Sequence, residues 1–223
     1  RYSFLAGMLA SVAFGVVGTY VVARRITYIA GAIAHCVLGG IGVALYAKLE
    51  LGFTRVEPLH GALISALLAA AIIGLVSLYG RQREDTVIGA IWATGMAVGA
   101  IFLARIRGAN VDPMSYLFGD ILMISRQDLW LIAGLDAVVV TLAVVFYNRF
   151  QAVCFDEEFA RLRGVNVGAW YLLLLCLAAL TIVLLVQLVG IVMVIALLTL
   201  PAAVAGTFSR RLWHMMALSV LTC

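Results

Sequence analysis

Long hydrophobic runs separated by short polar connectors follow one another along almost the whole chain. Seven of them, at about 4–23, 28–47, 61–79, 87–104, 129–147, 169–188 and 190–207, are near the length of a membrane span. A transmembrane helix needs about 20 mainly apolar residues. The pattern predicts an all-α, polytopic transmembrane helix bundle of about seven spans, in one domain that covers residues 1–223.

One stretch interrupts the pattern. Residues 108–128 are less hydrophobic and contain Asn110, Asp112, Pro113, Gly119 and Asp120. We expect a structured loop with a short helix there, inside a connector at about 105–128.

Small residues recur at helical spacing inside the runs. Gly7, Ser11, Gly15 and Gly18 form one stripe, and Gly95 and Gly99 form another. Stripes of this kind let two helix backbones approach closely where lipid removes the hydrophobic driving force. We expect both stripes to be helix-packing surfaces.

The composition agrees with a membrane protein. Apolar residues make up 65% of the chain and charged residues only 12%, whereas soluble domains have about 45–50% apolar residues. The net charge of +4 comes from basic residues at helix ends and does not indicate nucleic-acid binding. The four cysteines are scattered, which argues against a disulfide framework or a structural zinc site. Because the chain starts at Arg1 and stops within a short apolar run, we expect it to be truncated at both ends.

Basic residues predict the orientation, because cytoplasmic loops accumulate Lys and Arg. Alternating spans put nine basic residues on one side, namely Arg24, Arg25, Arg81, Arg83, Arg149, Arg161, Arg163, Arg210 and Arg211. The other side receives Arg1, Lys48, Arg55, Arg105, Arg107 and Arg126. The tightest clusters lie in short loops of the richer side, which we assign to the cytoplasm.

The sequence contains no recognisable catalytic motif. Lys48 is the only lysine, and its surroundings do not match the phosphate-binding GxxxxGK[ST] loop. Zinc-protease and nucleophile-elbow motifs are also absent. We therefore expect no enzyme activity on this chain, and any ATP it uses must be hydrolysed by another subunit.

Two ionisable residues lie inside predicted spans, where charge is costly and often functional. His35 shares a helix face with Gly31, Gly39 and Gly42, so it points toward a close neighbouring helix. It is a candidate metal ligand that lines a path, and the alternative is a neutral histidine bonded to a carbonyl group. Asp136, near the outer end of its span, is expected to have a solvated or hydrogen-bonded structural role.

Residues 155–166 predict a short amphipathic helix on the cytoplasmic side. Asp156 can cap it, Glu157 and Glu158 favour its first turn, and Gly164 can end it. Phe155, Phe159 and Leu162 fall on one face. The helix either docks a cytosolic partner or lies on the membrane surface.

These residues carry a resemblance to a known family. The chain resembles the permease subunits of bacterial ABC importers for zinc, manganese and iron, in five stretches that occur in order. They are Arg24–Ile29 with Ala34-His35, Glu84–Gly89, Leu117–Leu122, Phe155–Gly164 and Val189–Ala203, the last with Gly190 and Pro201 as packing positions.

The resemblance implies a homodimer in the bacterial inner membrane, related to vitamin B12 and siderophore permeases. It implies cytosolic ATPase subunits that bind ATP, an external metal-binding protein, and a divalent metal ion as cargo, with no permanent cofactor. Residues 155–164 would form the ATPase-coupling helix, through Phe155, Asp156, Glu157, Glu158, Phe159, Ala160, Arg161 and Gly164. The external protein would dock near Asp112 and Asp120.

The chain departs from this family beside the histidine. Many members have an aspartate one turn before it and a proline one turn after it, where this chain has Gly31 and Gly39. The metal preference is therefore open, with zinc our first choice and manganese or iron the others. A siderophore or cobalamin permease and an ion-coupled secondary transporter are the alternative functions.

Overall fold

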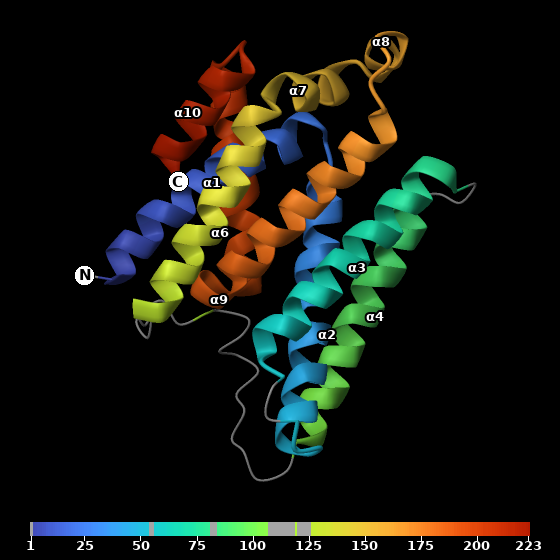
Figure 1. The fold of residues 1–223 in the computed structure, drawn as a ribbon, viewed down its shortest axis with the longest axis vertical. Coiled ribbons are helices and arrows are strands. Elements are labelled where there is room, and N and C mark those ends of the chain that lie inside the picture. Colours follow the sequence, from blue (N-terminus) through green and yellow to red (C-terminus); the bar gives the residue numbers. More distant parts are fainter. Residues whose placement is uncertain (1, 54–55, 81–83, 107–118, 120–125) are drawn as a thin grey trace.

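The computed structural model describes residues 2–53, 56–80, 84–106, 119 and 126–223, and all regular structure in those ranges is helical. The helices, shown in Figure 1, are α1 (Tyr2–Ala23), α2 (Thr27–Leu49), α3 (Pro58–Tyr79), α4 (Glu84–Arg105), α6 (Arg126–Val145), α7 (Tyr147–Phe155), α8 (Glu157–Leu162), α9 (Val167–Phe208) and α10 (Leu212–Thr222).

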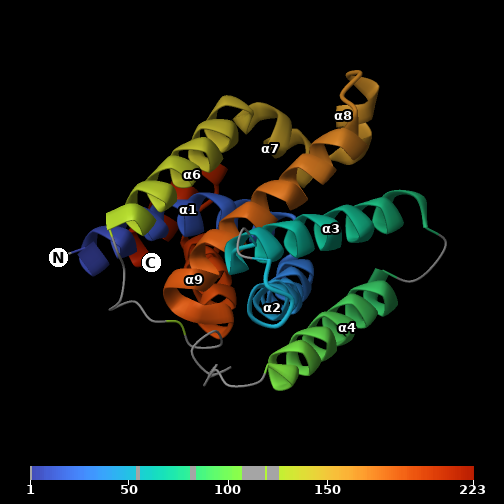
Figure 2. The same cartoon turned by 60° about the horizontal axis from the view of Figure 1, so that its bottom comes forward.

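Two groups of helices make up the bundle. In one group α2 lies between α3 and α4 and packs closely on both of them, as Figure 2 shows along the axis of α2. In the other group α1 packs on α6, α10 and α9. Helix α9 also packs on α2 and α3 and so joins the two groups.

Helix α9 is two spans and not one. Its 42 residues would extend about 63 Å as a straight helix, about twice the hydrocarbon thickness of a bilayer. At Gly190 the backbone leaves the helical region, with φ 75° and ψ 167°. The chain reverses there, so that both ends of α9 lie at the same end of the bundle (Figure 1).

The fifth predicted span, 129–147, corresponds to α6, and the chain bends at the end of it. Ile132–Val145 and Tyr147–Phe155 meet at an angle of 68°, so that α7 turns away from the direction of α6. Phe150 of α7 is fully buried, and its ring lies 5.3 Å from that of Tyr20 on α1. The Tyr20 hydroxyl donates a hydrogen bond to the carbonyl of Ala143 on α6. These contacts hold the bend against α1.

The prediction of about seven spans is confirmed. The described residues contain six helices long and apolar enough to cross a membrane, and the α6–α7 pair makes a seventh if it is counted as one span. Most of the predicted connector at 105–128, including Asp112 and Asp120, lies outside the described residues.

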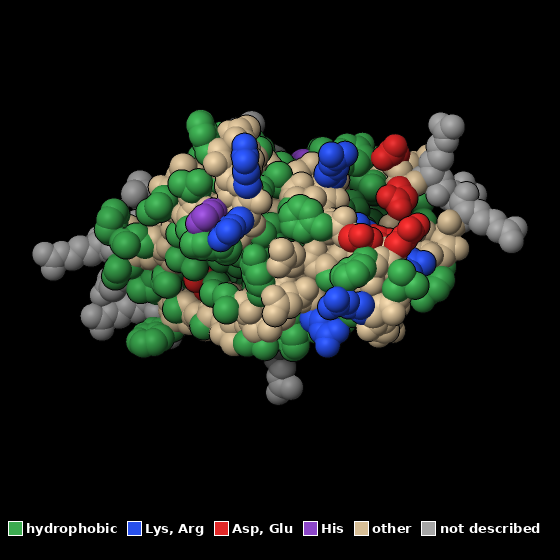
Figure 3. Space-filling model, turned by 90° about the horizontal axis from the view of Figure 1, so that it is seen from above, with side chains coloured by type: hydrophobic (Ala, Val, Ile, Leu, Met, Phe, Trp, Pro, Cys, Tyr) green, Lys and Arg blue, Asp and Glu red, His purple; other side chains and the backbone are tan. Residues whose placement is uncertain are grey.

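The described elements that carry the basic clusters gather at one end of the bundle, which we call the α8 end. It carries the turn between α1 and α2, helices α7 and α8, and the connector at 209–211. Seen from above in Figure 3, basic side chains spread across this end and acidic side chains gather on the side of α8. This grouping agrees with the alternation of spans used to predict the orientation.

Candidate functional site

A short helix is present in the predicted segment 155–164, but it covers only Glu157–Leu162, and Phe155 belongs to the preceding helix, α7. Both ends of α8 are formed by the residues that the sequence indicated. The Asp156 carboxylate accepts a hydrogen bond of 2.9 Å from the backbone N–H of Phe159, and so caps α8. Gly164 ends the segment with φ 75°, and the N–H of Val165 donates to the carbonyl of Ala160 across it. A glycine is favoured at this position because side chains disfavour a positive φ.

The outer face of α8 is apolar and exposed. Phe159 and Leu162 are 48% and 87% exposed, whereas Ala160 on the inner face is 1% exposed. Phe155, the last residue of α7, is 64% exposed next to α8. The Arg163 guanidinium lies 4.6 Å from the centre of the Phe159 ring. Large exposed apolar side chains next to charged ones are typical of an interaction surface.

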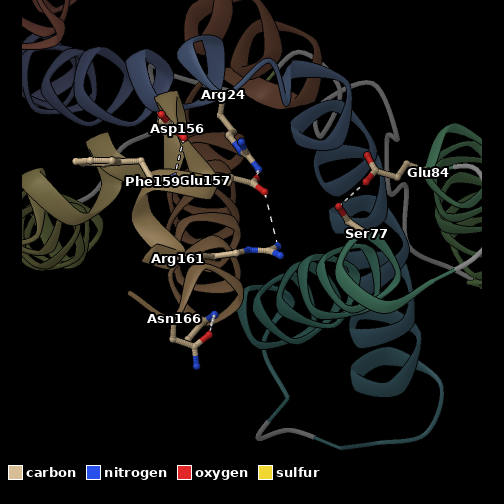
Figure 4. A network of polar contacts seen from close by, with 9 residues as sticks. Arg24, Ser77, Glu84, Asp156, Glu157, Phe159, Arg161 and Asn166 are labelled. Atoms are coloured by element: carbon tan, nitrogen blue, oxygen red, sulfur yellow. Dashed lines mark hydrogen bonds and ion pairs between the residues drawn. The ribbon is translucent and has the colours of Figure 1, made fainter. Parts of the chain in front are cut away.

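Glu157 does not share that outer face. Its carboxylate forms an ion pair with Arg24, in the turn between α1 and α2, as Figure 4 shows. Arg161, one turn further along α8, approaches the same carboxylate at 3.9 Å. The side chains of Arg24 and Glu157 are only 23% and 33% exposed, so the pair lies between α8 and the body of the bundle.

Polar contacts continue from Arg24 across the α8 end. The Arg24 guanidinium lies 5.3 Å from the centre of the Tyr171 ring on α9, and Tyr171 interacts through its side chain with Ser77 of α3. The Ser77 hydroxyl donates a 2.6 Å hydrogen bond to Glu84 in the first turn of α4 (Figure 4). These contacts could not be predicted from the sequence, because residues far apart in the chain make them.

His35 lies against Trp92 of α4. Their rings are stacked, with centroids 4.5 Å apart and planes inclined by 19°. The histidine Nδ1 is buried and has no hydrogen-bond partner among the described residues. Trp92 also covers Gly31, because a methyl group placed there would meet the indole ring at 3.4 Å. The tryptophan therefore occupies the space beside Gly31.

Of the glycines predicted to pack, Gly39, Gly95 and Gly99 lie at the crossing of α2 and α4. In the predicted stripe on α1, Gly15 packs closely on α10 and Gly18 on α9, whereas a methyl group at Gly7 would meet no atom within 4 Å. A methyl group at Gly39 would fall 2.8 Å from the Gly95 carbonyl oxygen, and one at Gly99 would fall 2.9 Å from the Leu38 backbone. Gly40 of α2 and Gly61 of α3 approach each other still more closely, at positions that were not predicted from the sequence. Pro201 is buried within the second span of α9. Gly190, predicted as a packing position, forms the reversal of α9.

An apolar groove of about 640 Å³ lies between α3 and α4, with α2 at its base. Cys36, Gly39 and Gly40 line it from α2, Ile64 and Leu68 from α3, and Thr94 and Val98 from α4. The Cys36 thiol donates to the Ile91 carbonyl at 3.3 Å. The groove reaches α2 at Cys36, the residue that follows His35, and His60 of α3 is the histidine that lines it.

The prediction that water reaches Asp136 is wrong for the single chain. Asp136 is 6% exposed, and its Oδ1 has no hydrogen-bond partner among the described residues. Within the described residues no three His, Cys, Asp or Glu side chains come together as a metal site. His35 is therefore not part of a ligand cluster in that part of the chain.

Comparisons with known proteins agree with this architecture. The chain is 42% identical over 221 residues to a "probable metal transport system membrane protein" of Chlamydia pneumoniae, covering 98% of this chain and 74% of that protein. It is 32% identical to the manganese transport system membrane protein MntC of Halalkalibacterium halodurans, covering 99% and 75%. A chain of PsaBC from Streptococcus pneumoniae in complex with Fab superposes with a TM-score of 0.84 at 28% identity, covering 98% and 76%.

The helices and the match to PsaBC define a multi-pass membrane protein with the fold of an ABC-transporter permease. The model of the ABC 3 transport family matches residues 1–223, and the chain belongs to that family. The resemblance to metal importer permeases found in the sequence is thereby confirmed.

Proposed function

We propose that the chain is the membrane-spanning permease subunit of an ATP-driven importer of divalent metal ions, with Mn²⁺ as the first candidate cargo. The observation that carries the proposal is the family match along all 223 residues. It is supported by a relative named for manganese transport that aligns with 99% of the chain. Because of that relative, we favour manganese as the cargo over zinc, which was the first choice from the sequence alone.

Energy enters through α8 in this proposal. Helix α8 is capped at one end by Asp156 and ended at the other by Gly164, and its outer face is apolar and exposed. This face is the surface to which a cytosolic ATPase subunit would bind. The helix is joined to the bundle through the Arg24–Glu157 ion pair. Displacement of α8 can therefore act on the spans.

The cargo passes close to α2. His35 shares a face of that helix with Gly31 and Gly39, and its buried Nδ1 has no hydrogen-bond partner among the described residues. Because no second ligand accompanies it among the described residues, a complete site would need a second copy of the permease or a residue outside those ranges. An external metal-binding protein would deliver the ion. A siderophore, cobalamin or ion-gradient transporter is not favoured by the relatives.

The experiment that tests the proposal uses the permease co-expressed with an ABC ATPase subunit that co-purifies with it. Right-side-out vesicles that contain both, with ATP inside and the external metal-binding protein added outside, should take up radiolabelled Mn²⁺ in an ATP-dependent manner. Phe159→Arg should abolish that uptake and the co-purification of the ATPase, because a charged group replaces a ring on the apolar face, while the permease stays inserted. Matched uptake of Zn²⁺ and Fe²⁺ by the same vesicles would rank the cargo ions.

Phe159→Leu is the matched control, because it keeps an apolar side chain at the same place and should retain most of the uptake. The docking role of α8 fails if Phe159→Arg still co-purifies the ATPase. The proposed transport function fails if wild-type vesicles with bound ATPase move none of the three ions.

A further inference from the structure

Helix α8 has little of its own to hold it in place. Of its six residues only Ala160 is buried, and its large apolar side chains face outward. A short helix with one buried residue needs another contact to fix its direction relative to the bundle. The Arg24–Glu157 ion pair is that contact, because it joins α8 to a turn far away in the sequence.

The turn that carries Arg24 has a fixed geometry. Arg25 adopts φ 62°, the left-handed region, and the N–H of Ile26 donates to the carbonyl of Val21 at 3.0 Å. This is the 6→1 hydrogen bond of a Schellman turn, with arginine in the place that glycine usually takes. Helix α2 begins immediately after the turn, at Thr27. Any force on Arg24 therefore acts on the first turn of the helix that carries His35.

Arg24 has a second neighbour, Tyr171, which connects it to helices α3 and α4. Its guanidinium lies over the ring of Tyr171, which is 3% exposed. Tyr171 interacts with Ser77, at the end of α3, and Ser77 bonds Glu84, at the start of α4. The ends of α2, α3 and α4, the three helices that form the groove, are thus all within reach of Arg24 through this series of contacts.

We propose that Arg24 is a positioning residue for energy coupling: its ion pair with Glu157 sets the direction of α8 and transmits movement of α8 to α2, and through Tyr171 and Ser77 to the α3–α4 pair. The inference rests on the proposed function, in which α8 is the ATPase-docking helix. It assigns to Glu157 an inward role, distinct from the docking role of Phe159. Partly exposed ion pairs contribute little to stability, so loss of this pair leaves the bundle folded.

The test compares Arg24→Gln, Glu157→Gln and the charge exchange Arg24→Glu with Glu157→Arg, in vesicles that contain permease and ATPase. Each single variant should retain ATPase co-purification, yet lose ATP-driven Mn²⁺ uptake by about 5- to 150-fold, the range typical of coupling between two sites. The number of ions moved per ATP hydrolysed should fall in the same variants. The charge exchange should restore part of the uptake, because it restores the pair, although not the contact with Tyr171.

Arg149→Gln is the matched control, since Arg149 is an exposed arginine on α7 at the same end, and it should behave as the wild type. Normal uptake and normal ion-to-ATP ratio in Arg24→Gln would overturn the inference. Loss of ATPase co-purification in Arg24→Gln would also overturn it, because Arg24 would then act in docking. Failure of the wild-type complex to bind ATPase or transport would instead count against the proposed function.

Discussion

At the scale of single residues, the sequence predicted the environment of His35 only in part. The spacing of Gly31, Gly39 and Gly42 placed the histidine toward a neighbouring helix, and the structure has it there, stacked on Trp92. The partner could not be foreseen, because helix crossing depends on packing along the whole of α2 and α4. An aromatic ring on one imidazole face still leaves the ring nitrogens free to bind a ligand in the plane.

His35→Ala should lower Mn²⁺ uptake by at least about tenfold, the scale on which even outer-shell partners change metal affinity. The ATPase should still co-purify, because α8 is unchanged. Uptake of radiolabelled Mn²⁺ by vesicles, normalised to the amount of inserted permease, measures the effect. His214→Ala, an exposed histidine on α10, serves as control. Unchanged uptake in His35→Ala would mean that His35 only packs on Trp92.

Two left-handed residues show what a sequence can and cannot reveal at this scale. Gly164 has φ 75° and ends α8, as predicted, because glycine marks such positions. Arg25 has φ 62° and ends α1 with the same turn, but an arginine carries no signal for it. The ion pair of its neighbour Arg24 with Glu157 could not be predicted from the sequence either, because it forms only when α8 folds back on the α1–α2 turn.

At the scale of helices, hydropathy was sufficient to find the spans, because each must satisfy its backbone hydrogen bonds internally and present apolar side chains. Hydropathy was not sufficient to predict helix α7. Tyr147–Phe155 contains Asn148, Arg149 and Gln151, so the bend of 68° after α6 follows from polar side chains that leave the apolar layer while Phe150 stays buried. Two adjacent hydrophobic runs indicated that the chain reverses near Gly190, but the backbone conformation of this glycine was not predicted.

The close crossing of α2 and α4 leads to a prediction on stability. Gly95→Ala should lower the free energy of unfolding by about 1–3 kcal/mol, the usual cost of overpacking a close contact. The reason is that the new methyl group would fall 2.8 Å from the Cα of Cys36, and the two helices would have to separate. Thermal unfolding of the purified permease in detergent, followed by thiol reactivity or light scattering, measures the change.

Gly89→Ala is a control on the same helix, because a methyl group there would have no atom within 4 Å. It should be neutral or stabilising by up to about 1 kcal/mol, since alanine favours a helix more than glycine does. Equal effects of the two substitutions would show that helix propensity, and not the crossing of α2 and α4, decides the stability of α4.

At the scale of the whole molecule, the uneven distribution of basic residues between the two ends of the bundle predicts the orientation of the chain in the membrane. The α8 end carries the α1–α2 turn, α7, α8 and the connector at 209–211, with the arginines of all four. The opposite end receives the last turn of α2, with Lys48, and the last turn of α4, with Arg105. The proposed energy coupling requires the α8 end to face the cytoplasm, because ATP is there.

Cysteine labelling tests this direction. In a chain whose four native cysteines are replaced, Leu162→Cys on α8 and Leu51→Cys after α2 introduce thiols at side chains that are 87% and 59% exposed in the wild type. A membrane-impermeant maleimide added to intact spheroplasts should label Leu51→Cys but label Leu162→Cys only after lysis, because excess Lys and Arg retain short loops in the cytoplasm. The experiment is done without added ATPase, so that a docked subunit cannot shield α8. Labelling of Leu162→Cys from outside would reverse the orientation, and an α8 at the external surface could not receive force from a cytosolic ATPase.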